Sequence, residues 1–315
     1  MTEPLDLGKI KTYPLSQRKN LVSTASFGKP LTPQGEYRAF LDSLPDILRA
    51  RDFKELCQRI VAASRGGKEI ILAIGAHQIK LCLAPFIMRL MDEGLVTALA
   101  MNGAGIIHDA EIALIGATSE DVAESIQDGS FGMAHETGEL VNSAAVEGAR
   151  TGEGLARALG RLIAERKLSH REYSLLDYCH EHRVCSTAHV AYGTDIVHMH
   201  PSADGAAIGK ATEIDFRKLA ARVCKLKGGV YMNIGSAVIL PEVFLKCLSI
   251  ARNLGHDVSD FTAANLDMVQ HYRPQENVVR RPMLPEGKGF ALTGNLEILF
   301  PLLTYCLLDL KAKGG

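Results

Sequence analysis

The chain has 315 residues, of which 47% are hydrophobic and 23% charged, and these values exclude a disordered or fibrous protein. Its 35 Lys and Arg residues balance 36 Asp and Glu residues, so net charge gives no reason to expect nucleic acid or an acidic membrane as a partner. Trp is absent and aromatic residues make up 6% of the chain, which argues against a surface that stacks single-stranded bases.

Targeting signals and cysteine usage indicate the compartment. No apolar run approaches the roughly 18 residues that a membrane-spanning helix needs, and the N-terminus lacks the apolar core of a secretory signal. The seven cysteines are scattered and suggest no disulfide framework. We therefore predict a reduced, cytoplasmic protein without a membrane partner.

The predicted elements follow the chain from a polar start. Residues 1–33 are weakly periodic and predict an N-terminal arm, either lying on a neighbouring subunit or free as a tail. From residue 34 apolar residues recur at helical spacing, which predicts one or two helices. Strands are then predicted at residues 69–74, 95–101, 184–189, 230–234, 261–264 and 289–293. Helices are predicted at residues 79–91, 108–115, 144–166, 170–181 and 216–225, after residue 237 up to 250, and at 295–310.

Apolar strands separated by helices predict an α/β fold, a Rossmann-like parallel sheet with helices on both faces. We expect a single domain over residues 34–315, with a helical insertion near residues 116–182. Ligands of such sheets bind outside the carboxyl ends of the strands. Turns of small residues are expected at those ends, beginning at Gly75, Asn102, Gly235, Thr262 and Thr293.

These turns favour a nucleotide without identifying one. A tight turn before a helix offers free backbone N–H groups and a partial positive charge, both of which favour a pyrophosphate. Short turns between strands and helices need Gly in any case, and neither G-x-G-x-x-G nor a P-loop occurs.

Three segments in order resemble the deoxyhypusine synthase family. They are the strand pair ILAIGAHQIKLCLAP and VTALAMNGAGIIHDAEIAL, the stretch SLLDYCHEHRVCSTAHVAYGTDIVH, and the tail that ends in TGNLEILFPLL. The resemblance covers roughly residues 68–310, with an insertion near 116–165. It implies an NAD-binding Rossmann-like sheet and a homotetramer with cofactor sites at dimer interfaces. The NAD contacts that it implies are Gly75, Ala76, His77, Asn102, Gly103, Ala104, Gly105, Gly235, Ser236, Thr262, Ala263, Gly294 and Asn295, where the family has Asp at the last position.

The resemblance breaks down on the substrate side. The family's reaction oxidises spermidine with NAD and passes an aminobutyl imine to an active-site Lys. Arg280, Arg281 and Pro282 stand where the family has Trp, Gly and that Lys, and a guanidinium cannot form the Schiff base. Lys288 is the one nearby replacement, which leaves open a polyamine aminobutyl transferase that uses a displaced lysine.

This chain also has fewer acidic residues than the family has at its substrate site. Ile107 and His108 replace an acidic pair, Asp195 and Glu276 match family acids, and Asp109 and Asp267 align less directly. Two Arg residues together suit a carboxylate or a phosphate. We therefore expect a substrate that carries an acid group, such as an amino acid, rather than spermidine.

A second, shorter resemblance concerns the stretch NGAGIIHDAEIALIGATS. It is similar to a segment in the NAD-binding domain of archaeal-type ornithine cyclodeaminases, whose chemistry also oxidises an amine to an imine. His108 could serve there as a general base oriented by Asp109, although Asp109 could instead cap a helix. His77 could contact the cofactor or be only a turn residue.

The sequence thus predicts an NAD-dependent enzyme that forms or uses an imine from a small amine or amino acid, and not an authentic deoxyhypusine synthase. The alternative of another class is a catalytically silent NAD-binding or ligand-sensing relative. Metal-dependent hydrolysis is a third reading, but the His and Cys residues at 179–185 and 198–200 lack a converging ligand pattern. We expect no metal.

Overall fold

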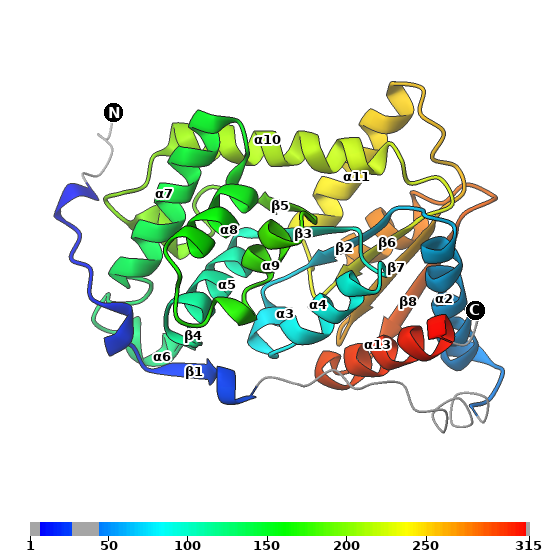
Figure 1. Ribbon diagram of the computed structural model, residues 1–315, viewed down its shortest axis with the longest axis horizontal. Coiled ribbons are helices and arrows are strands. Elements are labelled where there is room, and N and C mark those ends of the chain that lie inside the picture. The colour runs from blue at the N-terminus through cyan, green and yellow to red at the C-terminus, as the bar shows by residue number, and fades with distance from the viewer. Residues whose placement is uncertain (1–6, 27–43, 313–315) are drawn as a thin grey trace.

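The computed structural model describes residues 7–26 and 44–312, and the description below is confined to them. Its centre is a six-stranded sheet in the order β5-β3-β2-β6-β7-β8, in which every pair is parallel (Figure 1). The strands are β2 Ile70–Ile74, β3 Ala98–Asn102, β5 Cys185–His189, β6 Val230–Ile234, β7 Thr262–Asp267 and β8 Lys288–Thr293. This is the Rossmann strand order, with its reversal point between β2 and β6, and it confirms the predicted fold class.

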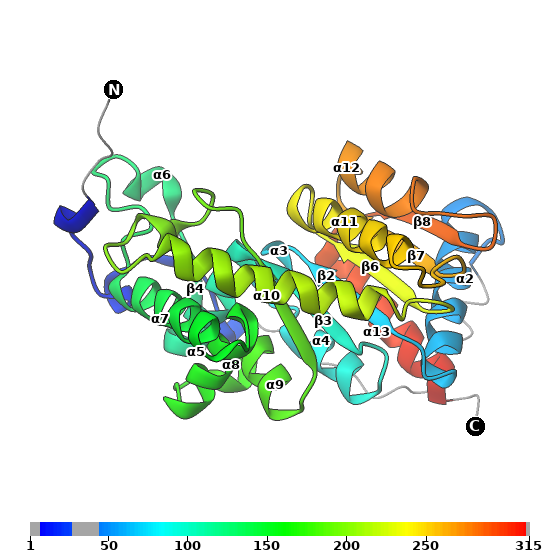
Figure 2. The same cartoon turned by 90° about the horizontal axis from the view of Figure 1, so that it is seen from above.

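Helices cover both faces of the sheet, so the side chains on both sides of its strands are buried (Figure 2). Ile70, Leu72 and Ile74 join one core with α2 (Leu48–Arg65), α4 (Ala84–Asp92) and α13 (Leu296–Ala312). Ile71 and Ala73 join a second core with α10 (Gly205–Val223) and α11 (Ile239–Asn253) on the opposite face. A strand buried on both faces reads as a continuous apolar run, which is why the sequence located these strands well.

The predicted helical insertion lies beyond the β5 edge of the sheet (Figure 1). It contains α6 (Val122–Ser125), α7 (His135–Thr151), α8 (Leu155–Glu165) and α9 (Leu175–Glu181), and α5 (Gly103–Ile115) precedes it. The other short elements are η1 Leu7–Lys9, η2 Leu15–Gln17, η3 Thr24–Ser26, α3 His77–Lys80, η4 Arg171–Tyr173, η5 Ile196–Met199, α12 Tyr272–Pro274 and the π-helical η6 Gln275–Arg280. No helix of the described residues is long and apolar enough to cross a membrane.

Several helix boundaries differ from the prediction for local reasons. The helix expected at 79–91 is interrupted between α3 and α4, where Cys82 has a φ of +59°. The helix expected at 144–166 divides into α7 and α8 at Gly152 and Gly154, which both have positive φ. Helix α10 begins eleven residues before the expected 216, because Asp204 caps it by accepting from the backbone N–H groups of Ala206 and Ala207. The residues of the first predicted helix before 44 lie outside the described residues.

The described part of the N-terminal arm lies along the insertion of its own chain. Strand β1 (Asn20–Ser23) pairs antiparallel with β4 (Ala117–Glu120), and Tyr13 donates a hydrogen bond to Glu120 at 2.6 Å. The Arg18 guanidinium donates to both carboxylate oxygens of Glu111 at 2.7 and 2.8 Å, and both side chains are buried. The arm is therefore held by a charged contact inside the protein rather than by surface packing alone.

Glu111 is the centre of this buried contact. Burial alone raises the pKa of a carboxyl group, but hydrogen bonds from His108 and Arg18 and their positive charge hold the pKa of Glu111 down to about 2. Thr137 adds a hydrogen bond at 3.2 Å. Because the folded pKa lies below the unfolded value, the stabilisation is present above about pH 4.5 and is lost as pH falls towards 2.

We predict that Arg18→Met lowers the free energy of unfolding at pH 7 by about 3–5 kcal/mol, because it leaves the Glu111 carboxylate buried without a cation. Urea unfolding followed by circular dichroism measures the loss. The control Lys19→Met removes an exposed cation of the same segment, paired with Glu124, and should lower the free energy of unfolding far less. Equal losses in the two variants would contradict the assignment.

Candidate functional site

The reversal point of the sheet is closed by the protein itself. The turns that follow β2 and β6 meet there, and a Cβ atom on Gly75 would lie only 2.0 Å from the carbonyl oxygen of Gly235. Gly235 itself has a φ of +63°. Gly75 is thus required by the approach of two backbones, so it does not indicate room for a pyrophosphate between them.

The glycines of the next turn have a similar explanation. A Cβ on Gly103 would lie 1.9 Å from a carboxylate oxygen of Asp195, and the side chain of Asn102 caps α5 by accepting from Gly105 N–H at 2.8 Å. A carboxylate therefore lies at the α5 N-terminus, where the sequence favoured a phosphate. While Asp195 is ionised, its charge disfavours a second anion at this turn.

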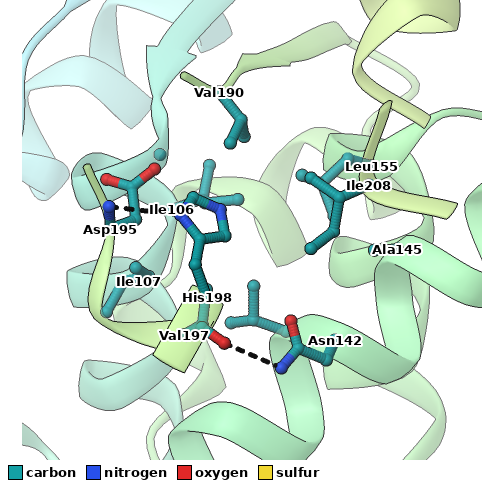
Figure 3. Close-up of a pocket in the computed structure, with 12 residues that line it drawn as sticks. Ile106, Ile107, Asn142, Ala145, Leu155, Val190, Asp195, Val197, His198 and Ile208 are labelled. Atoms are coloured by element: carbon teal, nitrogen blue, oxygen red, sulfur yellow. Dashed lines mark hydrogen bonds between the residues drawn. The ribbon is translucent and has the colours of Figure 1, made fainter. Parts of the chain in front are cut away.

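A narrow cavity lies beside this carboxylate, between α5, α7, α8, α10 and residues 190–198 (Figure 3). It holds a volume of about 10 Å³, room for about one water-sized group, inside about 250 Å³ that includes open solvent, and its walls are mainly apolar. The lining residues are Gly103, Ile106, Ile107, Val141, Asn142, Ala145, Leu155, Val190, Asp195, Val197, His198 and Ile208. Three of these twelve supply polar side chains, so the few hydrogen-bonding positions in the cavity are well defined.

Two of these polar side chains hold acceptor atoms without a partner. Asp195 Oδ2 and Asn142 Oδ1 are buried and accept no hydrogen bond from the described residues, while Asn142 Nδ2 donates to Val197 O at 3.0 Å. Burial raises the pKa of Asp195 from 3.8 to about 6. A carboxylate with this pKa is ionised at pH 7 and readily accepts a proton, which suits a general base.

His198 complements these two acceptors. Its Nδ1 accepts hydrogen bonds from the backbone N–H groups of Gly193 and Asp195 at 3.1 and 3.3 Å, so in the neutral ring Nε2 carries the proton. Burial lowers the pKa of His198, which favours that neutral form. The cavity thus presents one donor and two acceptors to a small guest.

An open groove adjoins the cavity across Val190, which lines both. The groove lies between α10 and α11 at the carboxyl ends of β5 and β6, and it encloses about 780 Å³ including open solvent. Its lining residues are His189, Val190, Ala191, Gly209, Thr212, Glu213, Phe216, Val238, Ile239, Glu242 and Val243. A cavity and a larger groove therefore meet at one edge of the sheet.

The groove contains a fitting position for a phosphate. Helix α11 begins in it at Ile239, and no described residue accepts a hydrogen bond from the backbone N–H groups of residues 236–239. Free N–H groups at the start of a helix with 15 residues attract an anion. Gly235 and Ser236, predicted as cofactor contacts, immediately precede this helix start.

The structure corrects three predicted positions at once. Thr262 and Ala263 begin β7 and Lys288 begins β8, and Thr262 is in register with Lys288 and with Val230 at the start of β6. All three lie at the amino edge of the sheet, about 17 Å of strand away from the carboxyl edge. Lys288 forms an ion pair with Glu55 there. The prediction that Thr262 and Ala263 follow a strand is wrong, and Lys288 is not available as a displaced lysine of this site.

The predicted substrate residues Arg280 and Arg281 also lie elsewhere. Their recorded contacts are with their own segment: Arg280 pairs with Glu276 at 2.9 Å, and Arg281 hydrogen-bonds Asn277 and Tyr272. This segment packs beside α11 on the sheet face opposite α13. The structure does not bring these arginines or Glu276 to the Asp195 cavity, so the argument for an acid group on the substrate loses its basis.

His108 and Asp109 do not form the expected dyad. Asp109 is fully buried and accepts hydrogen bonds from Ser174, Leu175 and Leu176, at the N-terminus of α9. It is a helix-capping residue, as the alternative allowed, but it caps α9 and not its own helix. His108 contacts Thr118 at 2.7 Å, in the network that holds the arm.

The other predicted residues lie at the carboxyl edge. His77 begins α3 directly after the Gly75-Ala76 turn. Asp267 ends β7, where its side chain accepts from Met268 N–H at 2.8 Å and its carbonyl accepts from Gly294 N–H at 3.2 Å. Asn295 precedes α13. Their contacts with a cofactor stay a prediction.

The sequence does not indicate that Asn142 and His198 line this cavity. Asn142 lies inside α7 and no local motif distinguishes it. The sequence draws attention to His198 only as part of a His-Met-His stretch, considered above as a possible metal site. It lies instead in the 3₁₀ turn Ile196–Met199. No group of three potential metal ligands occurs among the described residues.

Comparison with known proteins shows similarity of fold. No family model and no curated protein matches the chain. Its structure is similar to that of a conserved candidate LOR/SDH protein from Methanococcus maripaludis S2, with a TM-score of 0.53 and 14% identity over 89% of this chain and 74% of that one. A candidate deoxyhypusine synthase from Entamoeba histolytica has a TM-score of 0.49 and 11% identity over 94% and 96% of the chains.

AgrE, in a ternary complex with ornithine and NAD⁺, has a TM-score of 0.46 and 13% identity over 90% of this chain. The chain spans only 35% of the length of AgrE. At these identities the likenesses concern the fold alone, so the chemistry has to be argued from the site.

We compare the free energy of unfolding at pH 8 with that at pH 4. We predict that this difference is about 1–2 kcal/mol more favourable to pH 8 in Asp195→Asn than in the wild type. The folded pKa of Asp195 is raised, so its carboxyl favours folding below about pH 4, and this advantage is lost as pH rises through 6. Urea unfolding at both pH values measures the change.

Asp257→Asn is the control of opposite sign. Hydrogen bonds from Lys227 and Ser259 hold the pKa of Asp257 down to about 2, so this variant should lose rather than gain stability at pH 8. A pH dependence of Asp195→Asn that matched the wild type would mean that the Asp195 carboxyl is not buried as described.

Proposed function

We propose that the protein binds NAD in the α10–α11 groove and oxidises a small amine, whose nitrogen enters the Asp195 cavity, to an imine. The observation that carries the proposal is the buried, unpartnered Oδ2 atom of Asp195 in an apolar cavity next to a groove that fits a phosphate. The Rossmann strand order supports a cofactor at this edge of the sheet.

The groove residues supply what a dinucleotide requires. The free N–H groups at the start of α11 would hold a phosphate, and Phe216, Val238 and Val243 offer apolar surface for a ring. Glu213 and Glu242 also line the groove, but both form ion pairs, with Lys210 and Lys246 respectively. Bound NAD would supply the hydride acceptor.

The cavity residues account for the amine. In the reaction, the C–N single bond becomes a double bond as a hydride leaves the carbon and a proton leaves the nitrogen. Asp195 Oδ2 is placed to accept that proton, and Asn142 Oδ1 to accept a second N–H. His198 Nε2–H holds the donor position, so the three groups orient a nitrogen while the apolar walls exclude water.

The cavity also bears on the substrate class. Its walls carry Ile, Val, Leu and Ala side chains and no cation, and it has room for one water-sized group, so it suits the amino group of an amine whose aliphatic part lies in the adjoining groove. The structure removes the basis for an aminobutyl transfer through Lys288, which lies at the other edge of the sheet. A relative that binds NAD without turnover is the competing outcome of the tests below.

The first test adds NAD and a panel of amines to the full chain and follows absorbance at 340 nm. The panel contains aliphatic monoamines, diamines, ornithine and spermidine. We expect one or more aliphatic amines to produce NADH, with a rate that rises as pH passes about 6 because Asp195 must be ionised to accept the proton. Asp195→Asn should lower kcat by about 10²–10⁴-fold and leave the Kd for NAD unchanged. NAD binding without turnover for every amine would identify a silent relative.

A second test places the cofactor. Val238 is exposed at the start of α11, so Val238→Glu should fold and should weaken NAD binding by about tenfold or more through repulsion of a phosphate. Val122→Glu adds the same charge at an exposed position of α6, and it should leave the Kd for NAD unchanged. Isothermal titration calorimetry with NAD compares the two. Equal Kd values would exclude the groove as the cofactor site.

A further inference from the structure

A second hollow lies at the opposite edge of the sheet, where β5 begins. It encloses about 790 Å³ including open solvent, and we call it the amino-edge cleft. Its lining residues are Arg157, Cys179, His180, Arg183, Val184, Cys185, Ser186, Lys218 and Arg222. Four of these are cationic and none is acidic, although the whole chain has a net charge of −1. A local excess of positive charge in a neutral chain therefore coincides with a concave surface.

The cleft is separate from the candidate functional site. Strand β5 begins at Cys185 in the cleft and ends at His189 in the groove, which puts about 13 Å of strand between them. Helix α10 likewise reaches the cavity and groove with Ile208 and Gly209 and the cleft with Lys218 and Arg222. The cleft cannot therefore be an extension of the proposed NAD groove.

Two of the four cations are held in place by the protein. Lys218 donates to the carbonyl of Glu153 and lies 3.6 Å from Asp215. Arg222 donates to Thr97 O at 2.7 Å, and its Nε lies 3.2 Å from Glu69. Side chains fixed in this way lose little further freedom when they bind a ligand.

The other two cations lack a close carboxylate of their own. Arg157 lies 3.9 Å from Glu153, which is paired more closely with Arg161 at 2.7 Å. Arg183 forms no ion pair with the described residues. Nearby carboxylates thus compensate only part of the positive charge of the cleft, so the cleft can accept an anion.

The backbone at Arg183 is a second, independent observation. Arg183 has a φ of +57° just after the C-cap of α9, a position and conformation that favour Gly. An L side chain in this conformation is strained, and strained residues are found preferentially at binding sites. The strain places the one unpaired arginine of the cleft beside Val184 and Cys185.

We propose that the amino-edge cleft binds a small phosphate-bearing anion, and that Arg183 is its main contact. Guanidinium groups bind phosphate oxygens in a bidentate manner, and the cations that line the hollow come from α8, α10 and the α9–β5 turn. The proposal does not depend on the proposed function, because it uses neither the groove nor the cavity.

The test titrates the full chain with inorganic pyrophosphate and, separately, inorganic phosphate in a calorimeter at low salt. We expect saturable binding that weakens at higher salt. Arg183→Gln should weaken it by about tenfold, as for the loss of one charge-assisted contact, and Arg183→Lys should restore part of the affinity. Arg166→Gln removes an exposed cation at the end of α8 that does not line the cleft, and it should leave the affinity unchanged.

Arg183→Gly separates binding from folding. It removes the cation but relieves the positive φ, so the anion affinity should fall while Tm does not. Absence of saturable pyrophosphate binding to the wild type, or equal affinities in wild type and Arg183→Gln, would overturn the proposal. A loss of NAD affinity in Arg183→Gly would assign the cleft to the cofactor and would overturn the proposal of a separate site.

Discussion

The contact between Gly75 and Gly235 determines where this sheet can bind anything. In a parallel sheet of this strand order, the turns after the first and fourth strands normally separate and leave a crevice between them. Here the two backbones touch, since any side chain at Gly75 would collide with the carbonyl of Gly235. The crevice is closed, and the hollows of the carboxyl edge lie instead beside the β3 and β5 ends and under α10 and α11. The candidate site therefore lies beside the ends of β3 and β5 and not at the reversal point of the sheet.

The displaced site explains why a carboxylate is buried at a helix start. Asp195 approaches Gly103 so closely that no other residue fits there, and the partial positive charge of α5 offsets part of the cost of burying the acid. The offset is incomplete, because the pKa of Asp195 still rises to about 6. Asp195 caps the turn Ile196–Met199, but its second oxygen, Oδ2, is buried without a partner, and a costly buried atom of this kind fits a functional role better than a structural one.

The sequence predicted the sheet well and the site less well, for reasons visible in particular residues. Strands such as Ile70–Ile74 are buried on both faces, and a continuous apolar run reports that directly. The register of β7 is not encoded in the same way: Thr262 looks like a turn residue, yet it starts the strand and thereby moves to the other edge. Likewise Gly103 reads as a phosphate-binding glycine, although it accommodates Asp195, 92 residues later. Composition near a strand does not reveal such long-range packing.

Helix α10 contributes side chains to both the candidate functional site and the amino-edge cleft. Its first turns form walls of the cavity and the groove, and its last turns carry Lys218 and Arg222 into the amino-edge cleft. Asp215 lies between them, fully buried, and accepts hydrogen bonds from the backbone of Ala156 in α8 and Ala188 in β5. Both partners are backbone groups of neighbouring elements, so α10 is fixed against α8 and β5 near its middle. One helix, fixed near its middle, therefore contributes side chains to the candidate functional site at one end and to the amino-edge cleft at the other.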